Sequence, residues 1–345
     1  MLGIVAGLCL GRWDPAEADR LCPGLRVVLA RHETQPSNEG GVHQTRDGSE
    51  SELLHHLNEQ WHHLVRADNL LGPRAALQGV RDQLRIINEL LELTSANAPM
   101  RSDLLALAAR YAESASWLYE DSGELAQAHT WSGRAIQWAY EAEDGPMLAW
   151  AYFRKSQQAS TPGHALALVG TAQRHQQQLP VPIRASLLQH QATNLARTGD
   201  GSEAHRCFDR ALEWAVETDV YGDARAGHGS FCTADYIELE RARAWTELSS
   251  PQRAVGLFDE IIPRLPVVYQ RDRSVALARC ANAYVALGEV EHAAELAHKA
   301  LDIAHTTGTG RVVSDLAGLA NDLRPYHDVT TVAALLDELG VAAEY

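Results

Sequence analysis

Hydrophobic positions recur along this chain with the spacing of amphipathic helices, and three stretches repeat one internal order. In each stretch an amphipathic segment ends at a glycine, an acidic residue follows, and a second segment begins with alanine on its apolar side. The glycines are Gly123, Gly199 and Gly288. Small residues at a helix contact let two helices approach closely, so each stretch predicts a helical hairpin. One hairpin cannot bury its apolar side alone, and we therefore expect the hairpins to stack.

Weaker copies of this order lie between the three, and an earlier one turns at Gly72-Pro73. The alanines that share one register are Ala128, Ala165, Ala204, Ala254 and Ala293. This pattern resembles the tetratricopeptide repeat, whose consensus places Gly, Ala and aromatic residues in the same order over a period of about 34 residues. The resemblance implies an all-α fold, a right-handed superhelix (α-solenoid) of about six tetratricopeptide-like helical hairpins.

Glycine and proline divide the chain into predicted helices. We expect them at residues 51–70, 73–94, 101–121, 124–142, 146–159, 163–178, 182–198, 202–217, 232–248, 251–262, 271–287, 290–306, 311–323 and 328–340. Two segments interrupt the pattern. Residues 32–50, rich in Gly, Ser and Asn, predict a flexible linker, and the Gly-rich residues 222–230 predict an inserted loop, with a ligand lid as the alternative. The chain thus divides into an N-terminal helical remnant and linker (1–47) and a repeat domain with C-terminal capping helices (48–345).

Composition supports a large core and limits the partners. The 345 residues are 46% hydrophobic, and the formal net charge is −15, with no run of Lys or Arg. Because gripping nucleic-acid phosphates needs local positive charge, we expect no direct nucleic-acid binding by this chain. We also expect no membrane association, since no stretch is long and apolar enough to span a bilayer.

Cysteine usage indicates a reducing compartment. The five cysteines are widely spaced and form no CxxC pair. They predict neither a disulfide framework nor a zinc site. The short apolar N-terminus lacks the basic region of a signal peptide. We therefore expect a cytoplasmic protein.

Little in the sequence predicts catalysis. His55, Glu59 and His63 are spaced four residues apart, which places them on one helix face where they could supply ligands to a divalent metal. The spacing is not that of HExxH, and solvated histidines are the favoured interpretation. We predict a protein that is not an enzyme and uses no cofactor. A metal-dependent enzyme on a helical array is the alternative.

Four stretches carry a further resemblance, at residues 69–77, 108–118, 154–159 and 286–289. Together they resemble the C-terminal repeat region of actinobacterial transcriptional regulators that begin with a Cro/repressor-type helix-turn-helix domain. The resemblance covers residues 50–325 and lacks the DNA-binding domain. It implies a sensor or interaction module in a bacterial regulatory or signalling role. The alternative is a transcriptional regulator whose DNA-binding domain is missing or supplied in trans.

In a superhelix of hairpins the first helices line a concave groove. Placing each anchor alanine at the same repeat position predicts the groove residues His62, Arg66, Asn69, Glu113, Trp117, Trp150, Arg154, Gln157, Thr193, Tyr236, Arg243 and Asn282. Three arginines from separated repeats, with aromatic and amide groups, favour a peptide, a protein or a small anionic ligand. The alternative is an ordinary polar surface with Trp117 and Trp150 packed between hairpins. A homodimer is also compatible with the sequence.

Overall fold

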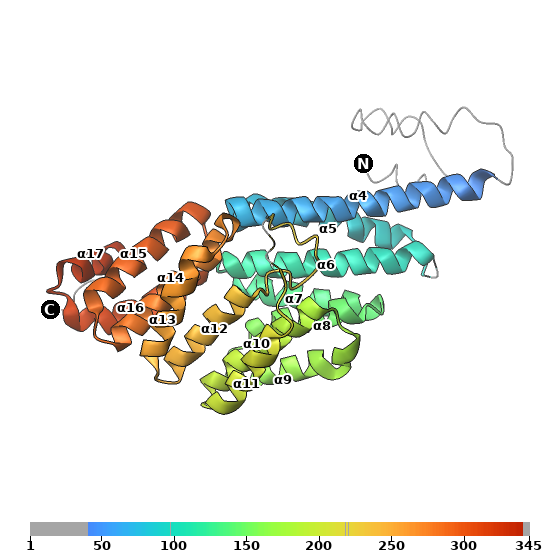
Figure 1. Ribbon diagram of the computed structural model, residues 1–345. Helices are drawn as coiled ribbons and strands as arrows, with labels where there is room; N and C mark the ends of the chain where they lie inside the picture. The colour runs from blue at the N-terminus through green and yellow to red at the C-terminus, as the bar shows by residue number, and fades with distance from the viewer. Residues whose placement is uncertain (1–40, 97, 218, 220, 341–345) are drawn as a thin grey trace.

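The computed structural model describes residues 41–96, 98–217, 219 and 221–340. Within these residues the α-helices follow one another as seven antiparallel pairs (Figure 1). The pairs are α4 (Gly41–Leu71) with α5 (Pro73–Leu93), α6 (Pro99–Asp121) with α7 (Leu125–Glu141), α8 (Gly145–Gln157) with α9 (Pro162–Ala172), α10 (Val181–Arg197) with α11 (Gly201–Leu212), α12 (Ala234–Glu247) with α13 (Pro251–Ile261), α14 (Gln270–Ala286) with α15 (Val290–Thr307), and α16 (Arg311–Leu323) with α17 (Thr330–Glu338). We call these pairs hairpins one to seven.

The predicted all-α solenoid is confirmed. Consecutive helices pack against one another along the whole described array, and its one β-bridge joins Val216 to Thr233. That bridge explains why α11 ends at Leu212, earlier than predicted, because the chain leaves the helix to form it. The predicted helix over 163–178 also ends early, at Ala172, and the Gln-rich residues after it, which have no apolar period, form the 3₁₀ helix η1 (Gln173–Gln178).

The predicted linker is wrong over residues 41–50, which belong to α4. Extending an existing helix adds a hydrogen bond for each residue fixed, and no proline follows Pro36 before the amphipathic part begins. The remainder of the predicted linker and N-terminal remnant, residues 1–40, lies outside the described residues.

The repeated turns show why glycine ends the first helix of the strongest hairpins. Gly123, Gly199 and Gly288 have φ values of 80°, 87° and 81°, in the left-handed region that side chains with a Cβ disfavour. In each turn the residue after the glycine donates its backbone N–H to a carbonyl five residues back, at 2.8–3.0 Å. This bond satisfies one of the free carbonyls at the helix end.

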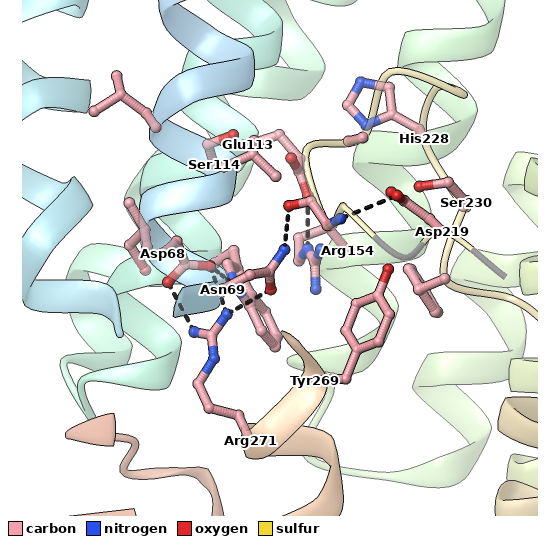
Figure 2. Close-up of a pocket in the computed structure, with 18 of the residues that line it drawn as sticks. Asp68, Asn69, Glu113, Ser114, Arg154, Asp219, His228, Ser230, Tyr269 and Arg271 are labelled. Carbon is pink, nitrogen blue, oxygen red and sulfur yellow. Dashed lines mark hydrogen bonds and ion pairs between the residues drawn. The ribbon is translucent and has the colours of Figure 1, made fainter. Parts of the chain in front are cut away.

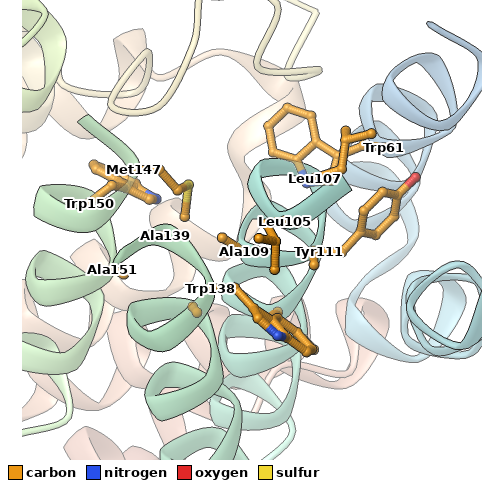
Figure 3. Close-up of a cluster of buried hydrophobic side chains, with 14 of the residues drawn as sticks. Trp61, Leu105, Leu107, Ala109, Tyr111, Trp138, Ala139, Met147, Trp150 and Ala151 are labelled. Atoms are coloured by element: carbon orange, nitrogen blue, oxygen red, sulfur yellow. The ribbon is translucent and has the colours of Figure 1, made fainter. Parts of the chain in front are cut away.

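The register alanines form the contacts between paired helices. Ala128, Ala204 and Ala293 are all fully buried. Large side chains fill the spaces beside such contacts, as Figure 3 shows for the cluster that includes Trp61, Tyr111, Trp138 and Trp150. The small residues set the helix separation, and the aromatic residues fill the gaps between successive hairpins.

The array also curls until its early and late hairpins touch. Figure 1 shows α14 beside the C-terminal part of α4. At this contact a Cβ on Gly72 would lie 1.8 Å from the carbonyl oxygen of Thr307, so only glycine fits there. The backbone N–H of Gly310 donates to the carbonyl of Asp121 at 2.6 Å. The contacts of this solenoid therefore include long-range ones that join hairpins one and two to hairpins six and seven.

None of the described helices is both long and apolar enough to cross a membrane.

The register predicts a sharp difference between two alanines of α7. Ala128 is fully buried between helices, whereas Ala126 is exposed. Ala128→Leu should lower the free energy of unfolding by about 1–3 kcal/mol, because the added atoms force α6 and α7 apart. Ala126→Leu adds the same atoms to the same helix and should change it by less than about 0.5 kcal/mol. Urea unfolding measures both, and equal stability of the two variants would show that the register is wrong.

Candidate functional site

The contact between early and late hairpins is built around one buried guanidinium. Arg271, in the first turn of α14, is 5% exposed. Its Nη1 donates to Asp68 Oδ1 at 2.7 Å and to Asp121 Oδ2 at 2.6 Å, and its Nη2 donates to Asp68 Oδ2 at 2.7 Å. The Thr309 hydroxyl donates to the other oxygen of Asp121. This cluster, Arg271 with Asp68 and Asp121, joins the ends of α4 and α6 to α14.

A cavity of ≈ 160 Å³ lies beside this cluster on the concave side of the array (Figure 2). Its walls come from α4, α5, α6, α8, α12, α14 and α16, from the 3₁₀ helix η3 (Val267–Tyr269), and from Asp219 and residues of the 222–231 segment. Aromatic rings and aliphatic side chains contribute most of the surface of the wall, and seven charged side chains lie among them. A concave space that combines apolar surface with polar groups in fixed positions is the usual form of a small-ligand site.

The 213–233 segment covers the cavity and is held by groove side chains of α4. The carbonyl of Asp223 lies 2.8 Å from His62 Nδ1, and the carbonyl of Gly222 accepts from Asn69 Nδ2 at 2.7 Å. Arg225 pairs with Glu59 at 2.8 Å. The residues predicted to form an inserted loop, 222–230, therefore lie across the groove. We call the described residues 213–217, 219 and 221–233 the cover segment.

The arginines that border the cavity already have carboxylate partners. Arg154 Nε donates to Glu113 Oε1 at 2.8 Å, and Arg311 pairs with Asp272 at 3.1 Å. Both guanidinium groups also lie over the Trp117 ring, 4.5 Å and 4.6 Å from its centroid. These charges are thus largely compensated within the wall itself.

Three buried polar atoms of the wall have no hydrogen-bond partner among the described residues: Trp150 Nε1, His228 Nε2 and Asp219 Oδ2. Trp150 is 3% exposed, and the His228 ring stacks on it with centroids 5.2 Å apart. Asp219 Oδ1 accepts backbone N–H groups from Tyr221 and Gly222 at 3.0 Å, which leaves Oδ2 as the unpartnered oxygen. Buried polar groups normally have partners, so these atoms indicate a position for ligand atoms or water.

The structure brings together more than half of the predicted groove residues. Those that border the cavity are Asn69, Glu113, Trp117, Trp150, Arg154, Gln157 and Tyr236. His62 instead holds the cover segment.

Besides His62, four predicted groove residues do not border the cavity. Arg66 is exposed, and Arg243 lies beside carboxylates of its own helix, Glu240 and Glu247, at 3.8 and 3.9 Å. The Thr193 and Asn282 side chains each hydrogen-bond a carbonyl of their own helix. The three predicted groove arginines therefore do not converge on one ligand position.

Several residues of the site were not predicted from the sequence. Arg271 precedes the part of α14 that the repeat register covers, and Asp219 and His228 belong to the cover segment, which has no register. No local pattern distinguishes them, although the glycines around His228 marked the segment as unusual.

The proposed metal ligands of the alternative enzyme interpretation do not form a donor set. His55 and His63 are exposed, and Glu59 is paired with Arg225, which holds the pKa of that carboxyl at about 2. Among the described residues, no group of three or more His, Cys, Asp or Glu side chains is arranged to hold a metal ion.

Comparisons with known proteins give little beyond the fold. No family model matches the chain. No curated protein matches it. Among solved structures, the chain is similar to a Rap protein in complex with competence and sporulation factor, with 13% sequence identity and a TM-score of 0.49 over 84% of this chain and 97% of that chain.

The Arg271 cluster should dominate the stability of the contact between early and late hairpins. Arg271→Ala leaves two buried carboxylates without their cation and should lower the free energy of unfolding by about 3–5 kcal/mol. Arg264 offers a matched control, since it pairs with Asp235 at the same 2.7 Å but is half exposed. Arg264→Ala should cost less than about 1 kcal/mol. Chemical denaturation compares them, and a loss of similar size in both variants would contradict this role of Arg271.

His228 should contribute to the pH dependence of stability. Burial and the nearby positive charges of Arg110 and Arg154 lower its pKa to about 3, whereas in an unfolded chain a histidine titrates near pH 6.5. The unfolded state therefore binds the proton first, and the free energy of unfolding should fall as the pH drops from 7 towards 4, by at most about 1.4 kcal/mol per pH unit for this side chain.

His228→Phe keeps a ring on Trp150 and removes the proton site. Its free energy of unfolding should depend less steeply on pH between pH 7 and pH 5 than that of the unchanged protein. Denaturation at several pH values measures this, and parallel profiles for the two proteins would exclude a neutral buried imidazole.

Proposed function

We propose that this chain is a non-catalytic helical-repeat domain that binds a small molecule, or one residue of a peptide or protein partner, in the cavity under the cover segment. We further propose that it does so in a regulatory or signalling role. The observation that carries this proposal is the cavity wall with unpartnered buried polar atoms, above all Trp150 Nε1. Leaving such a group without a partner costs about 1–3 kcal/mol, which a ligand with a suitable acceptor would recover.

The volume of the cavity limits what it can hold. A space of ≈ 160 Å³ is close to the about 150 Å³ that accommodates benzene in an engineered protein cavity. One amino-acid side chain or a small metabolite fits this space, whereas a folded partner does not. Any larger partner must therefore insert a single group and place the rest of its surface outside the cover segment.

The predicted anionic ligand receives less support than the cavity itself. Arg154, one of the three arginines from which an anionic ligand was predicted, is 8% exposed and paired with Glu113. Its guanidinium is also held by Gln157 Oε1 at 2.7 Å. An anion would have to compete with these internal partners for the charge. The wall favours a ligand whose polar groups match the unpartnered atoms.

The position of the cavity supplies a route to regulation. Its wall includes residues from hairpins one, two, three, five, six and seven, and it adjoins the Arg271 cluster. A ligand that contacts these hairpins together stabilises the array in which early and late hairpins touch, in proportion to its extra affinity for that state. Ligand binding would therefore change the population of this contact, and a partner protein that binds there would bind differently.

A second candidate is peptide binding in the groove after displacement of the cover segment. His62 and Asn69, both predicted groove residues, hold backbone carbonyls of that segment at 2.8 and 2.7 Å. Side chains that hold the backbone of an extended segment suit a peptide of any sequence. Under this alternative the cover segment occupies the peptide-binding groove, and a peptide binds by displacing it.

A pair of leucine variants in the cover segment tests the proposal. Ser230 borders the cavity and is 7% exposed, whereas Ala226 is exposed outside it. A diverse fragment library screened by ligand-observed NMR should yield binders of the unchanged protein. Ser230→Leu fills the cavity and should weaken them by at least about tenfold, a change of about 1.4 kcal/mol.

Ala226→Leu adds the same side chain outside the cavity and should bind the fragments as the unchanged protein does. The proposal fails if no fragment binds, or if fragments bind equally well to the Ser230→Leu protein.

A further inference from the structure

The unpartnered atoms of the cavity wall differ in polarity, and this difference defines a ligand class. Trp150 Nε1 is a donor only, and Asp219 Oδ2 is an acceptor. The two residues belong to α8 and to the cover segment, which face the cavity from separate elements. A ligand that satisfies both must carry an acceptor and an N–H or O–H donor at different positions.

The charges around the cavity follow the same division, with guanidinium groups near the donor Trp150 and carboxylates near the acceptor Asp219. Near His228 and Trp150 lie the guanidinium groups of Arg110 and Arg154, whose positive charge adds to burial in lowering the pKa of His228. Near Tyr269, burial and the carboxylates of Asp219, Asp272 and Asp223 raise the pKa of the phenol. In Figure 2 the Tyr269 hydroxyl points toward Asp219. The Arg154 guanidinium therefore lies on the His228 side of the cavity, and the unpaired Asp219 carboxylate lies on the Tyr269 side.

The balance of charge excludes a simple anion. The wall contains the carboxylates of Asp68, Glu113, Asp219 and Asp272 against the guanidinium groups of Arg154, Arg271 and Arg311. Each of these arginines has a carboxylate partner within 3.1 Å. Asp219 has none among the described ion pairs, and only its Oδ1 is used by backbone N–H groups.

We propose that the cavity binds a small zwitterion of the free amino-acid class, with its ammonium group at Asp219 Oδ2 and its carboxylate at Trp150 Nε1. The body of the ligand packs on the aromatic wall, and the volume admits a ligand on the order of six to eight non-hydrogen atoms. Charge-assisted hydrogen bonds at both groups give selectivity over molecules that carry only one of them. This inference rests on the proposed function and names the ligand of the same cavity.

The test uses the full chain and the twenty standard L-amino acids, added singly, with calorimetric titration and thermal unfolding as readouts. At least one of the smaller apolar amino acids should bind and raise the melting temperature. Its N-acetyl derivative lacks the ammonium and its carboxamide lacks the carboxylate, so each should bind at least about tenfold more weakly.

Two variants with matched controls place the ligand. Asp219→Asn removes the charge and keeps the shape, and Trp150→Phe removes the N–H together with part of the ring. Each should weaken binding at least about tenfold. Asp209→Asn is the control for the first, because Asp209 pairs with Arg241 at 2.6 Å and does not border the cavity. Trp138→Phe is the control for the second, since Trp138 is buried away from this cavity. Neither control should change the affinity.

The inference is overturned if none of the twenty amino acids binds, if the N-acetyl or carboxamide derivative binds as tightly as its parent, or if the Asp219→Asn protein keeps full affinity. Because the ligand derivatives need no variant protein, a variant that fails to fold does not remove the test. If the amino-acid test fails but fragments bind the unchanged protein and not the Ser230→Leu protein, the cavity is still a binding site and the proposed function stands. If no amino acid and no fragment binds, both proposals are rejected.

Discussion

The buried ion cluster of Arg271 with Asp68 and Asp121 is the constraint on which the rest of the structure depends. Arg271 is separated from its partners by 203 and 150 positions in the chain, and it meets them only because the solenoid curls through the intervening hairpins. Three charges removed from water are stable only when every member has its partners. The cluster therefore stabilises the one curvature of the array at which these charges meet. Apolar contacts alone would tolerate a wider range of curvatures.

The cavity follows from this curvature. Stacked hairpins fill the space between neighbours with alanines and aromatic rings, but they leave a space at the centre of the turn that no hairpin fills. The cover segment closes that space through backbone carbonyls held by His62 and Asn69. Asn69 also accepts from Arg271 at 3.0 Å, so one side chain connects the cover to the ion cluster. Closure of the array, cover and cavity are thus parts of one hydrogen-bonded unit.

The features that the sequence predicted correctly are those that depend on residues within one hairpin. Gly123 at a left-handed turn and Ala128 at a close helix contact act within one hairpin, and both appear directly in the repeat pattern. Trp150 and Arg154 were predicted as groove residues because their place in the first helix of a hairpin determines which side they face.

Arg271 and Asp219 could not be found in this way. The partners of Arg271 depend on the pitch accumulated over several hairpins, and small changes at each interface shift where the late hairpins arrive. Asp219 lies in an inserted segment that the repeat register does not cover. Its position therefore depends on the groove side chains that bind this segment. The ion pair of Arg154 could not be predicted for the same reason, because it depends on Glu113 in the preceding hairpin and on the Trp117 ring.

A double-mutant cycle between Asp68 and Arg271 tests most directly whether this ion cluster holds the early and late hairpins together. The unfolding free energies of Asp68→Asn, Arg271→Met and the double variant are measured by chemical denaturation. The account predicts a coupling energy of about 1–3 kcal/mol between two residues so distant in the chain. Arg271→Met leaves the Asp68 carboxylate buried without its cation, and Asp68→Asn leaves the Arg271 guanidinium with Asp121 as its remaining carboxylate. Additive effects within about 0.5 kcal/mol would show that the two residues do not interact and that the closed array is not held by this cluster.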